Sequence, residues 1–265
     1  MGVGAPRGAA LLAETVLHRA LRDGVAVLQT GTKSLQVETT DGVAFPVTTR
    51  VPVKGVAVDR DSLVVWSGKE AVVYQLATAA GGGGGGRGDF GAATEKDAFP
   101  SAATAMALKS GADGRDGTIF QAVGSKLEQV NFGGVVLNDI TFSEAEGRPV
   151  LLDTNGHFLA VATDRGVIKL YNTRRERKAP AQMGSAGRFV DAATRRPLGA
   201  MRSIAVNADG TRLSILSDHV HGGSLSIREP DTRLHVYDAD KDTVLHHDFG
   251  PDGAHGGGGG GGGGG

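Results

Sequence analysis

The 265-residue chain contains no cysteine, so disulfides and thiolate-based metal sites are excluded. A chain without cysteine is compatible with a reducing cytosol. No apolar run reaches the roughly 18 residues that a membrane-spanning helix requires, and we expect no membrane span. The 28 basic residues nearly balance the 29 acidic residues, which leaves no excess of positive charge for binding duplex nucleic acid. With 40% apolar residues, the composition is typical of one soluble domain.

The most informative stretch is 150–172, which predicts three short strands separated by turns. An apolar run at 150–152 meets an Asp-Thr-Asn-Gly turn, a β-rich run follows at 158–163, and an alternating run occupies 167–172. Alternation buries one face of a strand, because side chains in a strand repeat every two residues. Short turns make such strands antiparallel neighbours, which is typical of one blade of a β-propeller.

The same pattern recurs along the chain. The predicted strand pairs are 24–30 with 34–40, 62–66 with 70–76, 118–123 with 126–132, 158–163 with 167–172, and 211–217 with 232–238. Successive pairs begin about 38, 56, 40 and 53 residues apart, close to the roughly 40–50 residues of a propeller blade. Four pairs carry an aromatic residue near the end of the second strand, namely Tyr74, Phe132, Tyr171 and Tyr237. The sequence therefore predicts an all-β, WD40-type β-propeller, with degenerate blades because the strict Trp-Asp dipeptide is missing.

Domain boundaries follow from composition. Five strand pairs are fewer than the roughly six to eight blades of a usual closed ring, so we expect an incomplete propeller over 17–250, a fragment of something larger. Glycine runs at 81–86 and 256–265 cannot bury apolar surface, so a low-complexity insert at 78–100 and a tail at 251–265 are expected to be disordered. Residues 1–16 are expected to be disordered or to form an outer strand or short helix. The segment 9–22 is a candidate for a short helix or for the outer strand of a preceding blade.

We expect no catalytic, cofactor-binding or metal-binding residues, and no enzyme activity. Most of the histidines occur late in the chain, and a preorganised metal site needs ligands held by a rigid frame. Three of them are expected to be so exposed that replacing all three together leaves stability nearly unchanged, namely His219, His221 and His235. The adjacent Ser217-Asp218-His219 cannot adopt the geometry of a catalytic triad, which needs side chains from separate elements.

The remaining candidate residues have structural interpretations. Glu144 and Glu146 flank a loop and are expected to be solvated rather than to act in general acid–base chemistry. Trp66 ends a predicted strand and is expected to pack between blades. Three aspartates are assigned to blade turns, where the side chain accepts hydrogen bonds from its own backbone, namely Asp153, Asp209 and Asp238.

Several separate segments, in order and spacing, resemble one known family. They are GVAVLQ at 24–29, GVAV at 55–58, SLVVWSGK at 62–69, FSEAEGRP at 142–149, LD at 152–153, GHFLAVATD at 156–164, RRERK at 174–178, PDTRLHVYD at 230–238 and DTV at 242–244. Over residues 17–250, this set resembles the second WD-type propeller of the intraflagellar transport 140 family, whose members are subunits of intraflagellar transport complex A. The chain departs from the family pattern in its glycine-rich inserts, in residues 217–229, and in lacking a first propeller and a helical solenoid.

The resemblance implies a non-enzymatic scaffold that acts in retrograde ciliary transport and in ciliary entry of membrane proteins. The implied partners are other complex A subunits and ciliary membrane-protein cargo adaptors, with no cofactor and no nucleic acid. The implied locations are the cilium or flagellum, the basal body and the cytoplasm. Two alternatives remain open at this point: a WD40-like adaptor unrelated to cilia, and a propeller-fold hydrolase with a site in its central channel.

Overall fold

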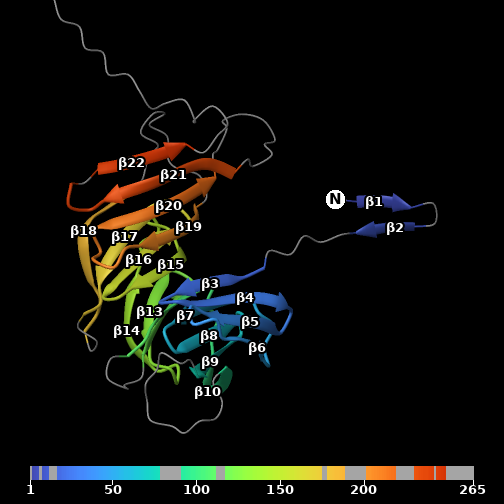
Figure 1. Ribbon diagram of the computed structural model, residues 1–265. Coiled ribbons are helices and arrows are strands. Elements are labelled where there is room, and N and C mark those ends of the chain that lie inside the picture. Colours follow the sequence, from blue (N-terminus) through green and yellow to red (C-terminus); the bar gives the residue numbers. More distant parts are fainter. Residues whose placement is uncertain are drawn as a thin grey trace, which may run out of the picture.

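The computed structural model describes residues 2–5, 8–11, 17–77, 91–111, 117–174, 178–188, 201–218, 230–241 and 243–248. All regular secondary structure in these ranges is β-strand, arranged as five four-stranded antiparallel sheets and one separate hairpin (Figure 1). The hairpin consists of β1 (Gly2–Ala5) and β2 (Gly8–Leu11). The described ranges contain no helix of the length and apolar character needed to cross a membrane. The predicted all-β propeller is therefore confirmed, with five blades numbered here in chain order.

Each blade is a meander of four strands that starts at the propeller axis and ends at the rim. Blade 1 consists of β3 (Arg19–Arg22), β4 (Val25–Gly31), β5 (Ser34–Thr39) and β6 (Ala44–Thr48). Blade 2 consists of β7 (Gly55–Asp59), β8 (Ser62–Trp66), β9 (Glu70–Ala77) and β10 (Ala92–Pro100). Blade 3 consists of β11 (Ala105–Lys109), β12 (Thr118–Val123), β13 (Lys126–Val130) and β14 (Val136–Thr141). Blade 4 consists of β15 (Pro149–Asn155), β16 (Phe158–Thr163), β17 (Val167–Asn172) and β18 (Ala181–Arg188). Blade 5 consists of β19 (Met201–Val206), β20 (Arg212–Asp218), β21 (Pro230–Asp238) and β22 (Thr243–Asp248).

Strand β8 shows how the sequence produces the packing between blades. Leu63 and Val65 lie in the core shared with blade 1, whereas Val64 and Trp66 lie in the core shared with blade 3. Successive side chains of a strand point to opposite faces, so a strand that is buried on both faces is apolar at every position. The expectation that Trp66 packs between blades is confirmed, since its side chain is 6% exposed.

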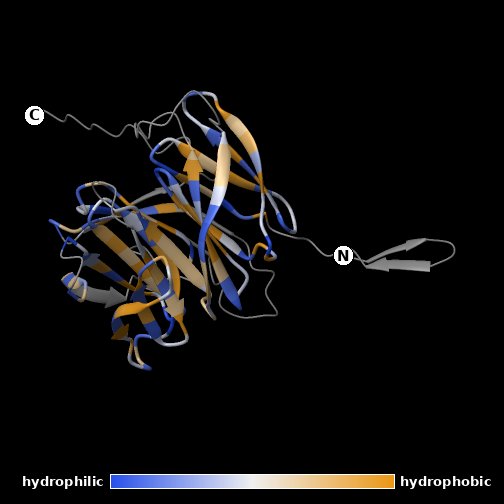
Figure 2. Cartoon of the chain, turned by 90° about the horizontal axis from the view of Figure 1, so that it is seen from below, coloured by the Kyte–Doolittle hydropathy of each residue, from blue (hydrophilic) through white to orange (hydrophobic). Residues whose placement is uncertain are grey.

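Four hydrophobic cores fill the spaces between successive blades. Figure 2 shows the corresponding pattern, with apolar residues concentrated in the strands and polar residues in the turns. Of the aromatic residues predicted near the strand ends, three are buried in these cores, namely Tyr74, Phe132 and Tyr171. Tyr237 is partly buried and packs against the core between blades 4 and 5. The aromatic signal in the sequence therefore marks packing between blades.

The inner strands pack in the order β3, β7, β11, β15 and β19, but β3 and β19 make no comparable contact within the described ranges. The outward faces of the two end blades carry exposed leucines. On blade 1 these include Leu21 (74% exposed) and Leu28 (46%), and on blade 5 they include Leu216 (39%) and Leu245 (66%). The faces that would meet a neighbouring blade in a closed ring are therefore uncovered in the described part of the chain.

Two sequence predictions about segment boundaries are wrong. The last part of the predicted insert 78–100 forms β10, the outer strand of blade 2, and Phe99 within it is buried. Its strand character was hidden by the charged residues 95–97, which lie at a β-bulge on an exposed sheet edge. The end of the predicted segment 9–22 forms β3, an inner strand of the propeller, instead of a helix or an outer strand. The glycine runs 81–86 and 256–265 lie outside the described residues.

Candidate functional site at the propeller axis

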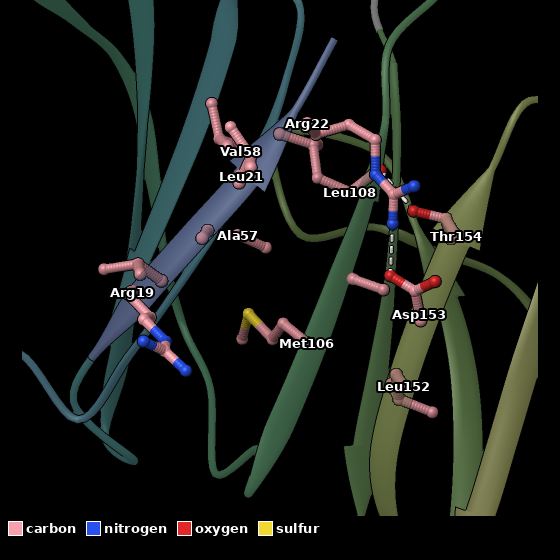
Figure 3. A pocket seen from close by; sticks show the side chains of 13 residues that line it. Arg19, Leu21, Arg22, Ala57, Val58, Met106, Leu108, Leu152, Asp153 and Thr154 are labelled. Atoms are coloured by element: carbon pink, nitrogen blue, oxygen red, sulfur yellow. Dashed lines mark hydrogen bonds and ion pairs between the residues drawn. The ribbon is translucent and has the colours of Figure 1, made fainter. Parts of the chain in front are cut away.

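The inner strands of blades 1 to 4 enclose a pocket of about 180 Å³ at the propeller axis (Figure 3). Strands β3, β7, β11 and β15 each contribute side chains to it. Its charged residues are Arg19, Arg22 and Asp153. Most of its other lining residues are apolar, but polar atoms form the larger part of its exposed wall. Four separate segments of the sequence thus converge on one small cavity, which makes it the strongest candidate site in the described structure.

An ion pair crosses this pocket from blade 1 to blade 4. The Arg22 guanidinium on β3 donates to the Asp153 carboxylate on β15, although the two residues are 131 positions apart in the sequence (Figure 3). The other carboxylate oxygen of Asp153 accepts the backbone N–H of Val206 in blade 5, at 2.8 Å. The Asp153 side chain therefore connects three blades.

The environment of Asp153 alters its ionisation. Burial raises the pKa of the Asp153 carboxyl, and the positive charge of Arg22 and the hydrogen bond from Val206 oppose that shift. Both members of the ion pair are largely buried, with side-chain exposures of 21% for Arg22 and 17% for Asp153. A carboxylate that is neutralised by a neighbouring arginine and by a backbone donor is suited to holding blades together, because its negative charge is already matched.

The sequence predicts that Asp153 lies in a turn, and this prediction is wrong. Strand β15 continues through Thr154 and Asn155, so the turn begins only at Gly156. Gly156 has a φ of +55°, a conformation that favours glycine. The β-branched Thr154 after Asp153 is the local signal that could have extended the predicted strand. No local sequence signal indicates that Arg22 is the partner of Asp153, because Arg22 comes from a different blade.

The turn assignments of the other two aspartates are confirmed. Asp209 accepts the backbone N–H of Thr211 at 3.0 Å and its hydroxyl at 2.6 Å. Asp238 accepts the backbone N–H groups of Asp240 and Lys241 at 3.1 and 3.2 Å. These side chains satisfy backbone donors within tight turns, as expected for aspartate in such positions.

Further polar contacts join neighbouring blades close to the axis. Between blades 4 and 3, Thr154 donates its hydroxyl to the Leu108 carbonyl at 2.6 Å. Between blades 2 and 3, the Asp59 carboxylate accepts the backbone N–H of Ser110 at 2.6 Å. Burial raises the pKa of Asp59, and the hydrogen bond from Ser110 opposes that rise. These contacts satisfy buried polar groups at the ends of inner strands and fix the blades relative to one another.

A second charged cluster lies between blades 3 and 4. The Lys169 ammonium lies 2.6 Å from the Glu146 carboxylate and 4.6 Å from the centre of the Phe142 ring. The hydrogen bond from Lys169, followed by one from the backbone of Ser143, lowers the pKa of Glu146. The expectation that Glu146 is simply solvated is therefore wrong, whereas Glu144 has a 96% exposed side chain, as expected. In the alternating run of β17, Lys169 stands between Ile168 and Leu170, and a polar residue in that position indicates the solvent-facing side of a strand. The sequence pattern therefore gives no sign that this lysine is buried.

Tyr171 lies beside this cluster and has an unusual hydroxyl. The side chain is 2% exposed, and its hydroxyl oxygen is buried without a hydrogen-bond partner. Burial strongly raises the pKa of Tyr171, and the negative charge of Glu146 adds to the rise. The hydroxyl is therefore neutral at physiological pH, which does not suit a general base or nucleophile.

The predicted histidines divide into two groups. His219 and His221 lie outside the described residues. His235 lies on β21 and is 1% exposed, so the expectation that it is exposed is wrong. It occupies the buried face of blade 5, opposite Ile215 on β20. Among the residues whose side chains are described, no three His, Asp or Glu residues lie close enough together to hold a metal ion.

Comparisons with known proteins agree on the fold. The family model described as "IFT140 second beta-propeller" matches residues 23–256. The Cps50 (Swd1) beta-propeller domain of Myceliophteria thermophila has a TM-score of 0.57 at 10% identity, over 92% of this chain and 76% of that one. The Pan2 WD40 domain of Neurospora crassa has a TM-score of 0.51 at 11% identity, over 88% and 65%. The computationally designed Ika8 protein has a TM-score of 0.52 at 12% identity, over 89% and 63%. At these identities, the solved structures establish the fold alone.

Proposed function

The chain belongs to the IFT140 second beta-propeller family, and on that premise we propose that it acts as a scaffold propeller within intraflagellar transport complex A. The observation that carries this proposal is the family match over 23–256, which includes nearly all of the five blades. Rigid blades suit the role, because they hold many turns in fixed positions on two broad faces. The family match supports a non-enzymatic role for the domain.

The finer parts of the proposal follow from the family. The domain contacts other complex A subunits and ciliary membrane-protein cargo adaptors. Through these contacts it acts in retrograde ciliary transport and in ciliary entry of membrane proteins, at the cilium, the basal body and in the cytoplasm. Within the chain, 17–250 is the propeller unit, and 1–16 and 251–265 lie outside it.

Co-purification from ciliated cells tests this function. The tagged 265-residue chain is expected to retain complex A subunits, whereas a tagged WD40 propeller of another family is not. Two charge-reversal variants then identify the face in contact. Arg60→Glu changes a turn that follows an inner strand, and Arg165→Glu changes a turn at the opposite end of the sheets. Recovery of no complex A subunit by the chain would contradict the proposal.

The alternatives predict different results. An adaptor unrelated to cilia would retain a reproducible set of other proteins and no complex A subunit. A propeller-fold hydrolase would need several carboxylates or histidines facing the channel. In the described part of the chain, the axial pocket contains one carboxylate, that of Asp153, and it is occupied by Arg22 and the Val206 N–H. The geometry therefore favours the scaffold over the hydrolase.

A further inference from the structure

An apolar patch lies on the rim of blade 3, away from the uncovered end faces. It consists of three consecutive residues, Val135, Val136 and Leu137, which are 59%, 51% and 46% exposed. The last two begin β14, the outermost strand of the blade. Blades 2 and 4 already flank blade 3 and leave these side chains exposed, so packing between blades does not account for them.

The edge of β14 is also less protected than the edges of other outer strands. β6 contains Pro46, and β10 contains a bulge with charged residues at 95–97. Prolines, bulges and charges are the usual means of keeping a sheet edge from pairing with another chain. β14 has no proline, and its bulge residue is Leu137, so 138–141 continue as a regular strand. An apolar edge of this kind indicates a binding surface.

The backbone of β14 has hydrogen-bonding groups that point away from the blade. Just after the strand, the Phe142 N–H donates to the Ser125 carbonyl at 2.8 Å. Hydrogen-bonded pairs alternate along an antiparallel ladder, so it is the alternate residues of β14, Ile140 and Asn138, that bond to β13. The N–H and C=O groups of Asp139 and Thr141 therefore point outward. In the described ranges β14 pairs with β13 and with no other strand.

The charges beside this edge favour a basic partner. Glu128 of β13 and Asp139 of β14 occupy directly opposite positions, where like charges repel. The Lys126 ammonium lies 3.0 Å from the Asp139 carboxylate, and Glu128 accepts a hydrogen bond from the Gln121 amide at 2.8 Å. Two carboxylates thus lie beside one ammonium, and the edge is negative. A second copy of the same edge would add to this repulsion, whereas a basic side chain would reduce it.

We propose that the edge of β14 binds an extended segment of a partner protein as an additional strand of blade 3. Apolar residues of the segment contact Val136 and Leu137, and a basic residue lies opposite Asp139. In such strand addition, the main-chain hydrogen bonds supply affinity and alternate side chains supply specificity. This inference rests on the proposed scaffold function only in taking the ligand to be part of a protein.

A short peptide binding to the 265-residue chain tests the proposal. The probe is fluorescein-labelled Ser-Val-Thr-Val-Thr-Lys-Ser-amide, in which both valines and the lysine lie on one face of an extended strand. We expect a saturable rise in its fluorescence anisotropy. In hydrogen exchange with mass spectrometry, the unlabelled peptide should slow exchange in 136–141. Exchange in 44–48, the outer strand of blade 1, should stay unchanged and serves as the internal control.

N-methylated peptides test whether the backbone is recognised. A strand pairs on one side through the N–H groups of alternate residues. One version of the probe is N-methylated on both valines and the other on both threonines, so each blocks a different side. We expect only one of the two versions to lose binding, by at least about tenfold. Slippage by one residue cannot restore it, because the valines would then turn to the other face.

Matched variants test the two side-chain elements. Leu137→Glu should weaken binding of the probe by about tenfold, whereas Leu28→Glu should not, because that equally exposed leucine lies on the end face of blade 1. Replacing the lysine of the probe by glutamine should weaken binding by about threefold. In Asp139→Asn the two probes should bind equally. The control Asp41→Asn, in an exposed turn of blade 1, should keep the preference for lysine.

Several results would overturn the proposal. They are no saturable rise in anisotropy, slowed exchange outside 136–141 only, equal binding of the two N-methylated probes, or equal effects of Leu137→Glu and Leu28→Glu. If Leu137→Glu fails to fold, Leu137→Ser removes the same apolar contact and is expected to weaken binding in the same direction. Saturable binding at β14 without complex A co-purification would refute the proposed function alone, and the reverse result would refute the strand-addition proposal alone.

Discussion

Removing the carboxylate of Glu146 is expected to destabilise the propeller more than removing its partner, the Lys169 ammonium. In Glu146→Gln, the ammonium stays in a site where its side chain is 8% exposed, and it loses the carboxylate 2.6 Å away. Breaking a fully buried ion pair from one side costs about 3–5 kcal/mol. Because the Glu146 side chain is 29% exposed, we expect the lower part of that range or less, about 2–3 kcal/mol.

Lys169→Met is the matched variant. It removes the positive charge but keeps an unbranched stem beside Phe142, so the packing between blades 3 and 4 is preserved. Glu146 then retains its hydrogen bonds from the Ser143 backbone and hydroxyl, at 2.8 and 3.0 Å, and its access to solvent. We expect a loss of at most about 1 kcal/mol, because replacing a buried charge by an apolar group of similar shape is often nearly neutral.

Urea and thermal unfolding of the two variants measure the difference. For a domain of this size, about 2–3 kcal/mol corresponds to a fall in Tm of roughly 5–10 °C. Since the pair lowers the pKa of Glu146, its contribution to stability is present above the ordinary pKa of glutamate and is lost as the pH falls through the lowered value. The unchanged protein should therefore approach the stability of Glu146→Gln as the pH falls through the lowered pKa of Glu146, because a protonated Glu146 no longer carries the charge that pairs with Lys169. A larger loss in Lys169→Met than in Glu146→Gln at pH 7 would refute this account.

Four further predictions follow from packing. Gly55→Ala places a Cβ atom against the Trp66 ring, closer than atoms can approach, and should lower the free energy of unfolding by about 1–3 kcal/mol in a urea titration. The control is Gly31→Ala, since neither glycine has a positive φ and the new Cβ at 31 meets only Ser34, at an ordinary 3.5 Å. Tyr171→Phe removes an unpartnered buried hydroxyl and should leave Tm unchanged or raise it, so a clear fall would reveal a partner for that hydroxyl. His235→Ala should lower Tm by several degrees, because the side chain is buried. Sedimentation analysis should show that the chain self-associates with increasing concentration through its uncovered end faces. Leu28→Glu should reduce this self-association. The control Leu137→Glu should not, because Leu137 is equally exposed (46% each) but lies on the outer strand of blade 3.

The parts of the fold that were predictable are those with local signals. The five predicted strand pairs correspond to the central strands of the five blades, because these strands alternate regularly or are apolar throughout and are joined by short turns. The outer strands were harder to predict. β6 contains Pro46, and β10 contains a charged bulge, and both features are usual at sheet edges and weaken the strand signal.

The site was much less predictable than the fold. β3 is four residues long, with an arginine at each end, and nothing in its sequence marks it as a strand at the axis. The ion pair between Arg22 and Asp153 depends on the positions of blades 1 and 4, which are fixed by the blades between them. Sequence reasoning located Asp153 in the correct hairpin but placed it in the turn, since an isolated aspartate before Thr-Asn-Gly is typical of one.

The ion pair across the axis also bears on how the chain folds. Closing a contact over 131 residues is entropically unfavourable in an unfolded chain, and the hairpins within each blade form over much shorter separations. Arg22 and Asp153 therefore meet only after blades 2 and 3 have assembled between them. Their contact belongs to the last stage of folding, so it slows the first step of unfolding rather than speeding the assembly of the blades.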